Sequence, residues 1–415
     1  MKKVLLMPAG IGIAHVGRLI MIAKELQKLQ VEVIFGAGAE ACKILKGENL
    51  PYRIIKEFPR NVYEEKIKKN NFFIYNRTNF TDFVKSEQAL YKKVKPDLIV
   101  FDTRITAKVS ATIAGIPLIS VNNADATSYY DYQKCRFPLN TTIGRYLPGK
   151  VVRLLEREYG QKFLLKAAER AIPAMLIAAM VNIFPAFIKL RYKPSRDPFQ
   201  FFQGDITLLA DIPEFRPVKN LPENIKMVGP IFWDGVNKLP VWSKEIEERN
   251  NIIYVTASGT GDKQIFLQML DFLKETDYTV IATTGNTLSP KEVTVSYPSL
   301  YLTDYLPGSY IMPRAQAVIF PGGNASCYQA LSYGVPQIAT PFHIDQEDNA
   351  NQLERLGTGV IQNHFKNFDR KHFLETVDKV ISNKSYRTKA GELKKIIANY
   401  NGKKTAARLI ADFMS

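Results

Sequence analysis

The feature that most constrains this chain is an alternation of short apolar strands and periodic helices that occurs twice. In the first 123 residues, segments such as KVLLMP and PDLIVFD are followed by segments with the period of amphipathic helices. A second alternation begins at NIIYVTASGTG and continues through AQAVIFPGG and VPQIATP. Each alternation is typical of a doubly wound parallel sheet, so we expect an α/β fold with two Rossmann-like domains.

Chain length and local composition place the domain boundaries. The chain has 415 residues, which suits two domains. The segment MVGPIFWDGVNKLPVW is rich in Pro and Gly and has little periodicity, which predicts a linker over residues 229–242. We expect an N-terminal domain over 1–228 and a C-terminal domain over 243–395. A final helix over 396–415, with a break near Asn401 and Gly402, could return to the first domain.

Charge and cysteine usage limit the partners and the compartment. A net charge of +16 attracts anionic partners. The basic residues are dispersed and show no nucleic-acid-binding signature, so we expect no nucleic acid but a phosphate-bearing ligand or an anionic membrane surface. Cys42, Cys135 and Cys327 are widely spaced and odd in number, which favours a reducing cytoplasm. We expect a cytoplasmic protein, with a peripheral position on the inner face of the membrane as the alternative.

One apolar segment does not follow the alternation. Residues Ala171–Ile188 are eighteen uncharged positions, which reaches the minimum length of a membrane-spanning helix. Pro173, Asn182 and Pro185 interrupt it, and it lies inside the first domain, so we favour a buried or substrate-covering helix. A spanning helix and an interfacial helix assisted by the basic segment before it are the alternatives.

The strongest candidate for a ligand site lies within residues 320–360, where a strand ends in Gly322 and Gly323 and a helix begins at once. The unpaired N–H groups and the positive dipole end of a helix start attract an anion, and glycine lets the backbone approach it closely. A diphosphate is the natural occupant. The next strand delivers Asp345 and Gln346 to the same carboxyl edge, where they can bind sugar hydroxyls.

A histidine and an aspartate are expected to meet in the first domain. His15 lies where the first strand gives way to the first helix, and Asp102 ends the fourth strand. The first and fourth strands are neighbours in a doubly wound sheet, so both side chains should reach one edge. A carboxylate that holds one imidazole nitrogen prepares the other to remove a proton from a hydroxyl. We predict His15 as a general base supported by Asp102, which could also cap the following helix.

The segment FPGGNASCYQALSYGVPQIATPFHIDQEDNANQLERLGTGV resembles the C-terminal signature of family 1 glycosyltransferases, the bacterial relatives of UDP-glucuronosyl and plant glycosyltransferases. Four further segments resemble segments of the same family and occur in the same order, and they are GDITLLADIPEF, MVGPIFW, YVTASGTG and YLPGSYIMPRAQAVIF. The resemblance extends over nearly the whole chain. It implies the GT-B fold, in which two Rossmann-like domains face each other across a cleft, and a nucleotide diphosphate sugar as donor.

The resemblance also implies roles for individual residues. It matches His15 and Asp102 to the family's catalytic dyad. It gives the nucleobase to Tyr305 and the backbone near Gly308, and the ribose to Gln329. The residues that would face or cradle the phosphates are Ser258, Gly259, Thr260, Gly323, Asn324, Ala325 and Ser326, and those on the transferred sugar are Asp345 and Gln346.

The sequence departs from the family pattern at the donor site. Pro321 stands where a histidine usually contacts a phosphate, and Gln329 stands where glutamate is common. Tyr305 and Gly308 replace frequent tryptophan and glutamine. These departures leave the choice between a UDP-sugar and a TDP-sugar open. Arg18, at a position that is often proline, is expected to replace the missing phosphate contact.

These observations predict an inverting hexosyltransferase that needs no metal and no other cofactor. The deprotonated hydroxyl would attack the anomeric carbon, while backbone dipoles stabilise the departing nucleoside diphosphate. We interpret His343 as structural, and His364 and His372 as surface positions. The aromatic residues of the first domain favour a hydrophobic or aromatic acceptor that carries a hydroxyl. A nucleotide-sugar epimerase on the same fold and a catalytically silent partner protein are the alternatives.

Overall fold

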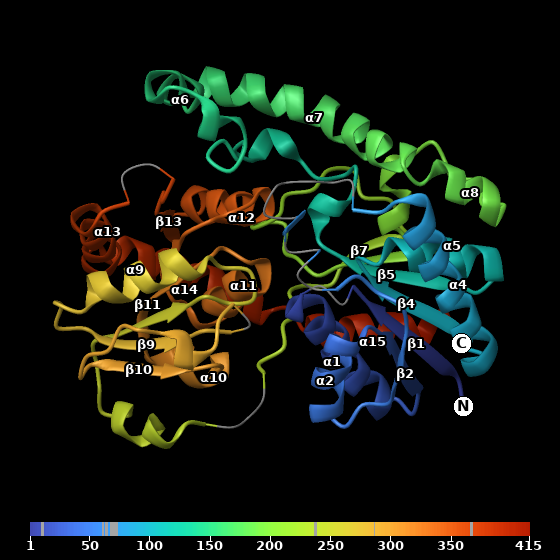
Figure 1. Ribbon diagram of the computed structural model, residues 1–415, viewed down its shortest axis with the longest axis horizontal. Coiled ribbons are helices and arrows are strands. Elements are labelled where there is room, and N and C mark those ends of the chain that lie inside the picture. Colours follow the sequence, from blue (N-terminus) through green and yellow to red (C-terminus); the bar gives the residue numbers. More distant parts are fainter. Residues whose placement is uncertain are drawn as a thin grey trace. The chain divides into compact units, whose positions relative to one another are not determined.

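The computed structural model describes residues 1–9, 12–59, 62, 65, 66, 74–235, 239–285, 287–365 and 368–415 (Figure 1). Contacts divide the chain into two compact units. The first unit comprises Met1–Lys134, Lys166–Trp233 and Tyr400–Ser415, and the second comprises Cys135–Leu165 and Asp234–Asn399. The boundary between Trp233 and Asp234 falls inside the predicted linker 229–242, of which residues 236–238 lie outside the described residues.

The first unit contains a parallel sheet with the order β3-β2-β1-β4-β5-β6-β7 among the described strands. Its strands are β1 (Lys3–Pro8), β2 (Glu32–Ala37), β3 (Tyr52–Ile54), β4 (Leu98–Asp102), β5 (Leu118–Asn122), β6 (Ile206–Leu209) and β7 (Ile225–Met227). The expected pairing of the first and fourth strands is confirmed, because β1 pairs with β4 and Pro8 lies opposite Asp102. This register brings the carboxyl ends of the two strands together.

Helices cover both faces of this sheet. They are α1 (Ile13–Lys28), α2 (Ala39–Gly47), α4 (Arg77–Val94), α5 (Ile105–Ala114), α8 (Phe184–Leu190) and α15 (Gly402–Phe413). Alternate side chains of β1 enter different cores, as the two-residue period of a strand requires. Val4 and Leu6 pack with residues of α1 and α15, whereas Leu5 and Met7 pack with residues of α4 and α5. The last helix of the chain is therefore part of the first unit.

The second unit contains a parallel sheet with the order β10-β9-β8-β11-β12-β13 among the described strands. Its strands are β8 (Ile252–Thr256), β9 (Thr279–Thr283), β10 (Leu300–Thr303), β11 (Ala315–Phe320), β12 (Gln337–Ala339) and β13 (Gly359–Ile361). Its helices are α6 (Gly149–Leu155), α9 (Lys263–Leu273), α10 (Gly308–Ile311), α11 (Asn324–Tyr333), α12 (Ile344–Arg355), α13 (Arg370–Ser382) and α14 (Lys384–Ala398). The predicted class, two α/β domains with parallel sheets, is confirmed.

Short 3-10 helices connect several of these elements. In the first unit they are η1 (Ala124–Ala126), η2 (Tyr132–Lys134) and η4 (Pro198–Phe202). In the second unit they are η3 (Ile143–Tyr146), η5 (Val241–Ile246), η6 (Pro290–Glu292) and η7 (Met312–Arg314). Because η5 begins at Val241, regular structure starts before the end of the expected linker.

The segment Cys135–Leu165 belongs to the second unit, although the sequence order placed it in the N-terminal domain. The carboxylate of Glu347 on α12 accepts the backbone N–H groups of Asn140, at 2.8 Å, and of Thr141, at 2.5 Å. Glu347 is buried, so these bonds are shielded from water. Arg136 adds an ion pair of 3.3 Å to Glu354. Contacts with α12 therefore determine the position of this segment.

The apolar segment Ala171–Ile188 forms parts of two helices. Helix α7 (Glu158–Val181) continues through Pro173, and α8 begins at Phe184. No residue of α7 after Leu165 is buried, so the expectation of a buried helix is wrong for this part. Among the described residues, no single helix has the length and apolar composition to cross a membrane. Only α7 and α8 taken together have that length and composition, and the two helices are bent by 58° relative to each other.

Candidate active site

The two residues expected to form a catalytic pair are in contact in the first unit. His15 is the third residue of α1, and Asp102 is the last residue of β4. Nδ1 of His15 lies 2.7 Å from Oδ1 of Asp102. The Asp102 side chain is fully buried, whereas 29% of the His15 side chain is exposed. The imidazole is thus the part of this pair that a substrate can reach.

Neighbouring groups keep Asp102 ionised. Burial by itself would raise its pKa, but the positive charge of Arg18, the interaction with His15 and a hydrogen bond from Thr103 outweigh burial, and the pKa of Asp102 is lowered. An ionised carboxylate only accepts hydrogen bonds, so Nδ1 of His15 carries the proton that it donates. The other ring nitrogen, Nε2, then carries the lone pair. This tautomer is the one that a general base requires.

Arg18 lies in a different environment from the one expected. Its side chain is only 4% exposed; Nη1 forms a 3.2 Å ion pair with Oδ2 of Asp102, and Nη2 donates to Oδ1 of Asn123 at 2.8 Å. A guanidinium enclosed in this way is not available to a donor phosphate. These contacts do not support the expectation that Arg18 replaces the missing phosphate contact. Arg18 instead belongs to the surroundings of Asp102.

The turn after β4 fixes the direction of the Asp102 carboxylate. Thr103 has a left-handed backbone conformation, with φ of 54°, and its hydroxyl donates to Oδ1 of Asp102 at 2.9 Å. Helix α5 is capped at Arg104, without a side-chain hydrogen bond. The alternative role of Asp102 as a helix cap is thus not observed, because its carboxylate binds His15, Arg18 and Thr103.

A buried polar network holds this turn from the other side. Nε of Arg104 lies 2.7 Å from Oε1 of Glu87, and its Nη1 lies 2.7 Å from Oε1 of Glu57. Nη1 also lies 3.4 Å from the carbonyl oxygen of Pro8, at the end of β1. The network therefore links the ends of β1 and β4, from which His15 and Asp102 are positioned. The charge of Arg104 is balanced by two carboxylates, as a buried cation requires.

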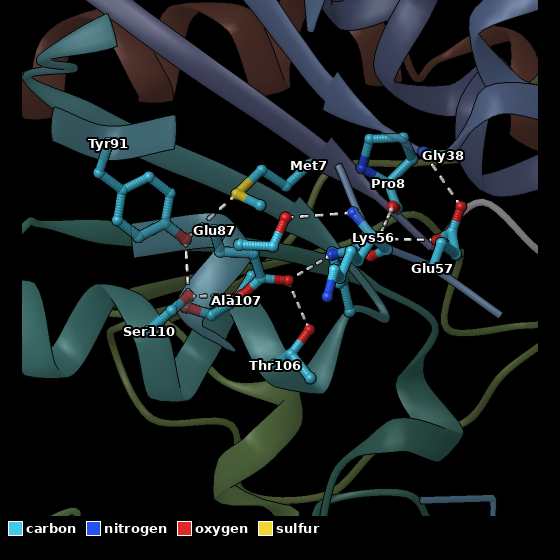
Figure 2. Close-up of polar contacts among 12 residues, drawn as sticks. Met7, Pro8, Gly38, Lys56, Glu57, Glu87, Tyr91, Thr106, Ala107 and Ser110 are labelled. Carbon is cyan, nitrogen blue, oxygen red and sulfur yellow. Dashed lines mark hydrogen bonds and ion pairs between the residues drawn. The ribbon is translucent and has the colours of Figure 1, made fainter. Parts of the chain in front are cut away.

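The carboxylate of Glu87 is saturated with hydrogen bonds. Figure 2 shows Glu87 beside Thr106, Ser110 and Tyr91. Thr106 and Ser110 donate to its two oxygens, each at 2.6 Å, and the Tyr91 hydroxyl lies 2.7 Å from Oγ of Ser110. Burial, and then the charge of Glu87, raise the pKa of Tyr91, so the phenol stays neutral. A network this well satisfied serves structure, because it leaves little capacity to bind a ligand.

The second unit contains the glycine turn that was expected to bind an anion. Gly322 has φ of 101°, and a Cβ there would lie 2.8 Å from the carbonyl oxygen of Gln346. Gly323 is the N-cap of α11, which has no side-chain cap, and a Cβ there would meet no atom within 4 Å. The packing of the chain therefore requires glycine at 322 but leaves space at 323. Gly323, Asn324, Ala325 and Ser326 are half-buried, so the first turn of α11 is accessible.

The turn after β8 lies beside this glycine turn. Ser258 has φ of 53°, and a Cβ at Gly285 would lie 1.9 Å from its carbonyl oxygen. The Gln346 amide donates to Oγ1 of Thr260 at 2.9 Å and accepts the Phe342 N–H at 2.8 Å. Gln346 is only 1% exposed, so its expected contact with sugar hydroxyls is not supported. It instead joins the loops after β8 and β12. Asp345, the next residue toward the start of α12, is exposed.

The residues expected at the nucleobase and ribose lie close together. A Cβ at Gly308 would lie 2.0 Å from Nε2 of Gln329, so this glycine permits the close approach. Gln329 donates to Oδ1 of Asp234 at 3.1 Å, and the same oxygen accepts the Ser309 N–H at 2.8 Å. Tyr305 contacts the backbone of Gly235. Asp234 was not among the residues expected in the site, although a carboxylate in the Gly-containing segment FWDG is a recognisable signal.

Comparisons with known proteins now identify the chain. Residues 267–411 match a family described as erythromycin biosynthesis protein CIII-like, C-terminal domain. The PGL/p-HBAD biosynthesis rhamnosyltransferase of Mycobacterium bovis is 30% identical over 396 residues, covering 94% of this chain and 83% of that protein. This chain belongs to the family 1 glycosyltransferases. The PGL/p-HBAD biosynthesis glycosyltransferase of Mycobacterium tuberculosis is 29% identical to this glycosyltransferase over 398 residues, covering 94% and 88%.

Solved structures show the same fold. The spinosyn rhamnosyltransferase SpnG matches this glycosyltransferase with a TM-score of 0.71 and 14% identity, covering 99% of this chain and 100% of that chain. The glycosyltransferase VinC in complex with dTDP matches with a TM-score of 0.68 and 13% identity, covering 99% of both chains. At these identities the likeness establishes the GT-B fold, which confirms the expected fold family.

The other departures of this glycosyltransferase have local structural explanations. Pro321 is buried, and a Cβ at Gly261 would lie 3.1 Å from its ring, so it fills space beside the loop after β8.

His364 is not the surface residue expected, because its ring lies 4.2 Å from that of Phe342, and burial lowers its pKa to about 4. His372 is exposed, as expected.

Proposed function

We propose that this family 1 glycosyltransferase is an inverting enzyme that transfers a hexosyl group from a TDP- or UDP-sugar to an acceptor hydroxyl. In this proposal His15 is the general base and Asp102 is the residue that orients it. The observation that carries the proposal is the 2.7 Å contact between Nδ1 of His15 and a buried Asp102 carboxylate whose pKa is lowered. An epimerase would not need a base prepared in this way for a second substrate.

The proton transfer follows from the tautomer of His15. Nδ1 donates to the ionised Asp102, so Nε2 can accept a proton from the acceptor hydroxyl. As this proton moves, the hydroxyl oxygen forms a bond to the anomeric carbon, and the bond from that carbon to the diphosphate oxygen breaks. The electron pair of the broken bond leaves with the nucleoside diphosphate. Attack and departure on opposite faces of the sugar invert the anomeric configuration.

The imidazolium formed in this step is stabilised by Asp102. Its positive charge lies next to a buried carboxylate, where the effective dielectric constant is lower than in water. Arg18 competes for the same carboxylate but binds the other oxygen, so it does not displace His15. Arg18 therefore acts on the reaction through Asp102, as a positioning residue.

We propose that the negative charge on the departing diphosphate is stabilised by the start of α11. The backbone N–H groups of its first turn have no side-chain cap, and Gly323 leaves space for an anion to approach them. The proposed phosphate contacts are Ser258, Gly259, Thr260, Gly322, Gly323, Asn324, Ala325 and Ser326. This stabilisation needs no metal ion, and metal independence is therefore part of the proposal.

The donor and the acceptor are inferred from chemistry and from relatives. Tyr305, Gly308 and Gln329 lie together, and the proposed contacts to a nucleoside are the Tyr305 ring, the backbone near Gly308 and the Gln329 amide. A structural neighbour is a complex with dTDP, and another is complexed with spinosyn aglycone. These favour a TDP-sugar and a hydrophobic or aromatic acceptor that carries a hydroxyl. Asp345, exposed at the start of α12, is the proposed contact to the transferred sugar.

Turnover with a panel of TDP-, UDP- and GDP-sugars tests this proposal. Purified protein, mixed with a set of hydrophobic phenols and alcohols, should release nucleoside diphosphate and form a glycoside of inverted anomeric configuration by NMR. His15→Ala should lower the rate about 10²- to 10⁴-fold, which is the usual contribution of a general base. His372→Ala is the matched control, because Nδ1 of His372 lies 2.6 Å from a carboxylate of Asp369 that is exposed on α13.

The outcomes separate the candidate functions. An isomerised nucleotide sugar without glycoside formation would indicate an epimerase. Absence of both turnover and nucleotide binding would indicate a silent partner protein. A retained anomeric configuration, or equal rate losses in the His15 and His372 variants, would contradict the proposed base.

A further inference from the structure

Helices α7 and α8 carry an outward apolar face in the first unit. No residue of α7 after Leu165 is buried, and residues 171–182 carry no charge. Its large apolar side chains are exposed by 52% to 67%, and they form the i, i+4 pairs Ile177 and Val181 on α7 and Phe184 and Ile188 on α8. We call this set the α7–α8 face. Water-exposed apolar side chains that follow one another along two helices are typical of a surface that binds a partner.

The opposite side of α8 is anchored in the first unit. Phe187 and Ala186 are buried with Phe80 and Val84 of α4. The ring of Phe187 stacks on that of Phe201, with centroids 5.6 Å apart. Figure 1 shows α8 next to α4 and α5, with α7 leading to it. Because this inner side is already packed, the α7–α8 face is the outer side of a fixed element.

Basic side chains border this face. Residues 166–196 include six exposed basic residues, which are Lys166, Arg170, Lys189, Arg191, Lys193 and Arg196. The segment has one acidic residue, Glu169, which is paired with Lys219 at 2.9 Å. Apolar side chains flanked by unbalanced positive charge match the two parts of an anionic lipid surface, which are its acyl boundary and its headgroups.

We infer that the α7–α8 face docks on an anionic lipid bilayer, with Ile177 and Val181 in the acyl boundary and the basic residues among the headgroups. The helices lie on the membrane and do not cross it, because they are bent by 58° and α8 is held by the core of the first unit. A second copy of the chain is a poorer occupant, since pairing two such faces would bring their basic borders together. The net charge of +16 strengthens the attraction to anionic headgroups.

Vesicle flotation without donor or acceptor tests the electrostatic part. The protein should float with phosphatidylcholine–phosphatidylglycerol vesicles at low salt, less at high salt, and much less with phosphatidylcholine alone. The double variant R170E/K189E should bind the anionic vesicles at least about 25-fold more weakly, since each basic residue near the surface contributes about fivefold. The matched control K384E/K395E makes the same charge change at exposed positions of α14 and should bind within about twofold of the unchanged protein.

A second pair of variants tests the apolar part. I177S/V181S removes two side chains that are 52% and 65% exposed, and L239S/V241S removes two that are 42% and 99% exposed elsewhere. Only the first variant should lose vesicle binding. Both should keep the thermal unfolding midpoint of the unchanged protein, because neither pair is in a core.

The inference is overturned if the unchanged protein does not float with anionic vesicles. It is also overturned if the control variants lose binding as much as the α7–α8 variants. Sedimentation velocity tests the alternative occupant. If the protein does not bind vesicles but forms a dimer, and I177S/V181S dissociates that dimer, the α7–α8 face binds a second copy of the chain. These measurements use no glycosyl transfer, so they are independent of the proposed catalytic role of His15.

Discussion

Nη1 of Arg18 lies 3.2 Å from Oδ2 of Asp102, and Nδ1 of His15 lies 2.7 Å from the other oxygen of the same carboxylate. One buried carboxylate thus serves a fixed cation and a titratable ring. The fixed cation lowers the pKa of Asp102 and so determines that His15, and not Asp102, carries the shared proton. An arginine on the first helix therefore influences the proposed base, His15, through the carboxylate that both residues contact.

Replacing Arg18 should shift the pH dependence of the reaction. In Arg18→Met, Asp102 loses its strongest stabilising charge, its pKa rises, and the acidic limb of the kcat profile should move to higher pH. We expect kcat at neutral pH to fall about tenfold, a change of about 1.4 kcal/mol in the barrier. Arg18→Lys keeps a positive charge and should move the limb less. A profile that is unchanged in Arg18→Met would remove the positioning role.

The same substitution should also make the fold less stable in acid. The pKa of Asp102 is lower in the folded chain than the unfolded value of about 3.9, so its ionisation stabilises the fold above that pH. This contribution is lost as the pH falls through the lower folded value. In Arg18→Met the pKa of Asp102 in the folded chain rises. Acid unfolding, followed by circular dichroism, should therefore begin at a higher pH than in the unchanged protein.

Replacing Asp102 should separate orientation from binding. Asp102→Asn removes the negative charge and allows the amide to bind the wrong tautomer of His15, so we expect kcat to fall about 10²- to 10⁴-fold. Affinity for the nucleoside diphosphate, measured by calorimetry, should change less than threefold, about 0.7 kcal/mol, since the proposed donor contacts lie in the second unit. Asp369→Asn, at the exposed imidazole–carboxylate pair of α13, is the control. Loss of nucleotide affinity in parallel with kcat would argue against the assigned role.

Two adjacent glycines should respond differently to substitution. Gly322→Ala forces a side chain onto a residue with φ of 101° and toward the Gln346 carbonyl oxygen, so it should destabilise the fold by about 1–3 kcal/mol. At Gly323 an added Cβ meets no neighbouring atom, so Gly323→Val should lower the melting temperature less than Gly322→Ala does. It should nevertheless weaken TDP binding at least about tenfold, because the side chain occupies the proposed diphosphate position.

The control for these substitutions is Gly391→Ala on α14, where a Cβ also meets no atom within 4 Å. This variant should keep TDP affinity and melt at the same or a slightly higher temperature, since alanine favours a helix over glycine. If Gly323→Val binds TDP as well as Gly391→Ala does, the start of α11 is not the diphosphate site.

Glu347 should control the attachment of Cys135–Leu165 to α12. Glu347→Gln turns one of the two acceptor oxygens into a donor, which then faces the N–H group of either Asn140 or Thr141, and it should cost about 1–3 kcal/mol. We expect faster cleavage within this segment in limited proteolysis. Glu354→Gln removes a partly exposed ion pair to Arg136 and should have a smaller effect. Equal cleavage rates in the two variants would contradict the special role of the buried Glu347.

The local pattern was sufficient for the sheets and for the contact between His15 and Asp102. Strands β1 and β4 were recognisable because both are uninterrupted apolar runs, and their adjacency follows from the order of a doubly wound sheet. That adjacency predicts that His15 and Asp102 lie at one edge of the sheet. The Gly322–Gly323 turn was recognisable because its chemistry lies in consecutive residues.

The apolar segment shows where local pattern fails. Its composition fits a buried helix as well as an exposed one, since hydrophobicity alone does not say what covers a side chain. Only the packing of Phe187 on α4 and the exposure of Ile177 and Val181 distinguish the two. Likewise, nothing in the order of residues 135–165 shows that buried Glu347 fixes this segment to α12.

The sequence by itself determined two parallel α/β domains, the meeting of His15 with Asp102 and the Gly322–Gly323 turn before α11, because each depends on periodicity or on neighbouring residues. The tertiary structure alone decided the roles of Arg18, Gln346 and Asp234. Each of these polar side chains had several partners within its reach. Burial selects among such partners, since a charge or an amide removed from water must be satisfied by whatever group the fold brings within hydrogen-bonding distance.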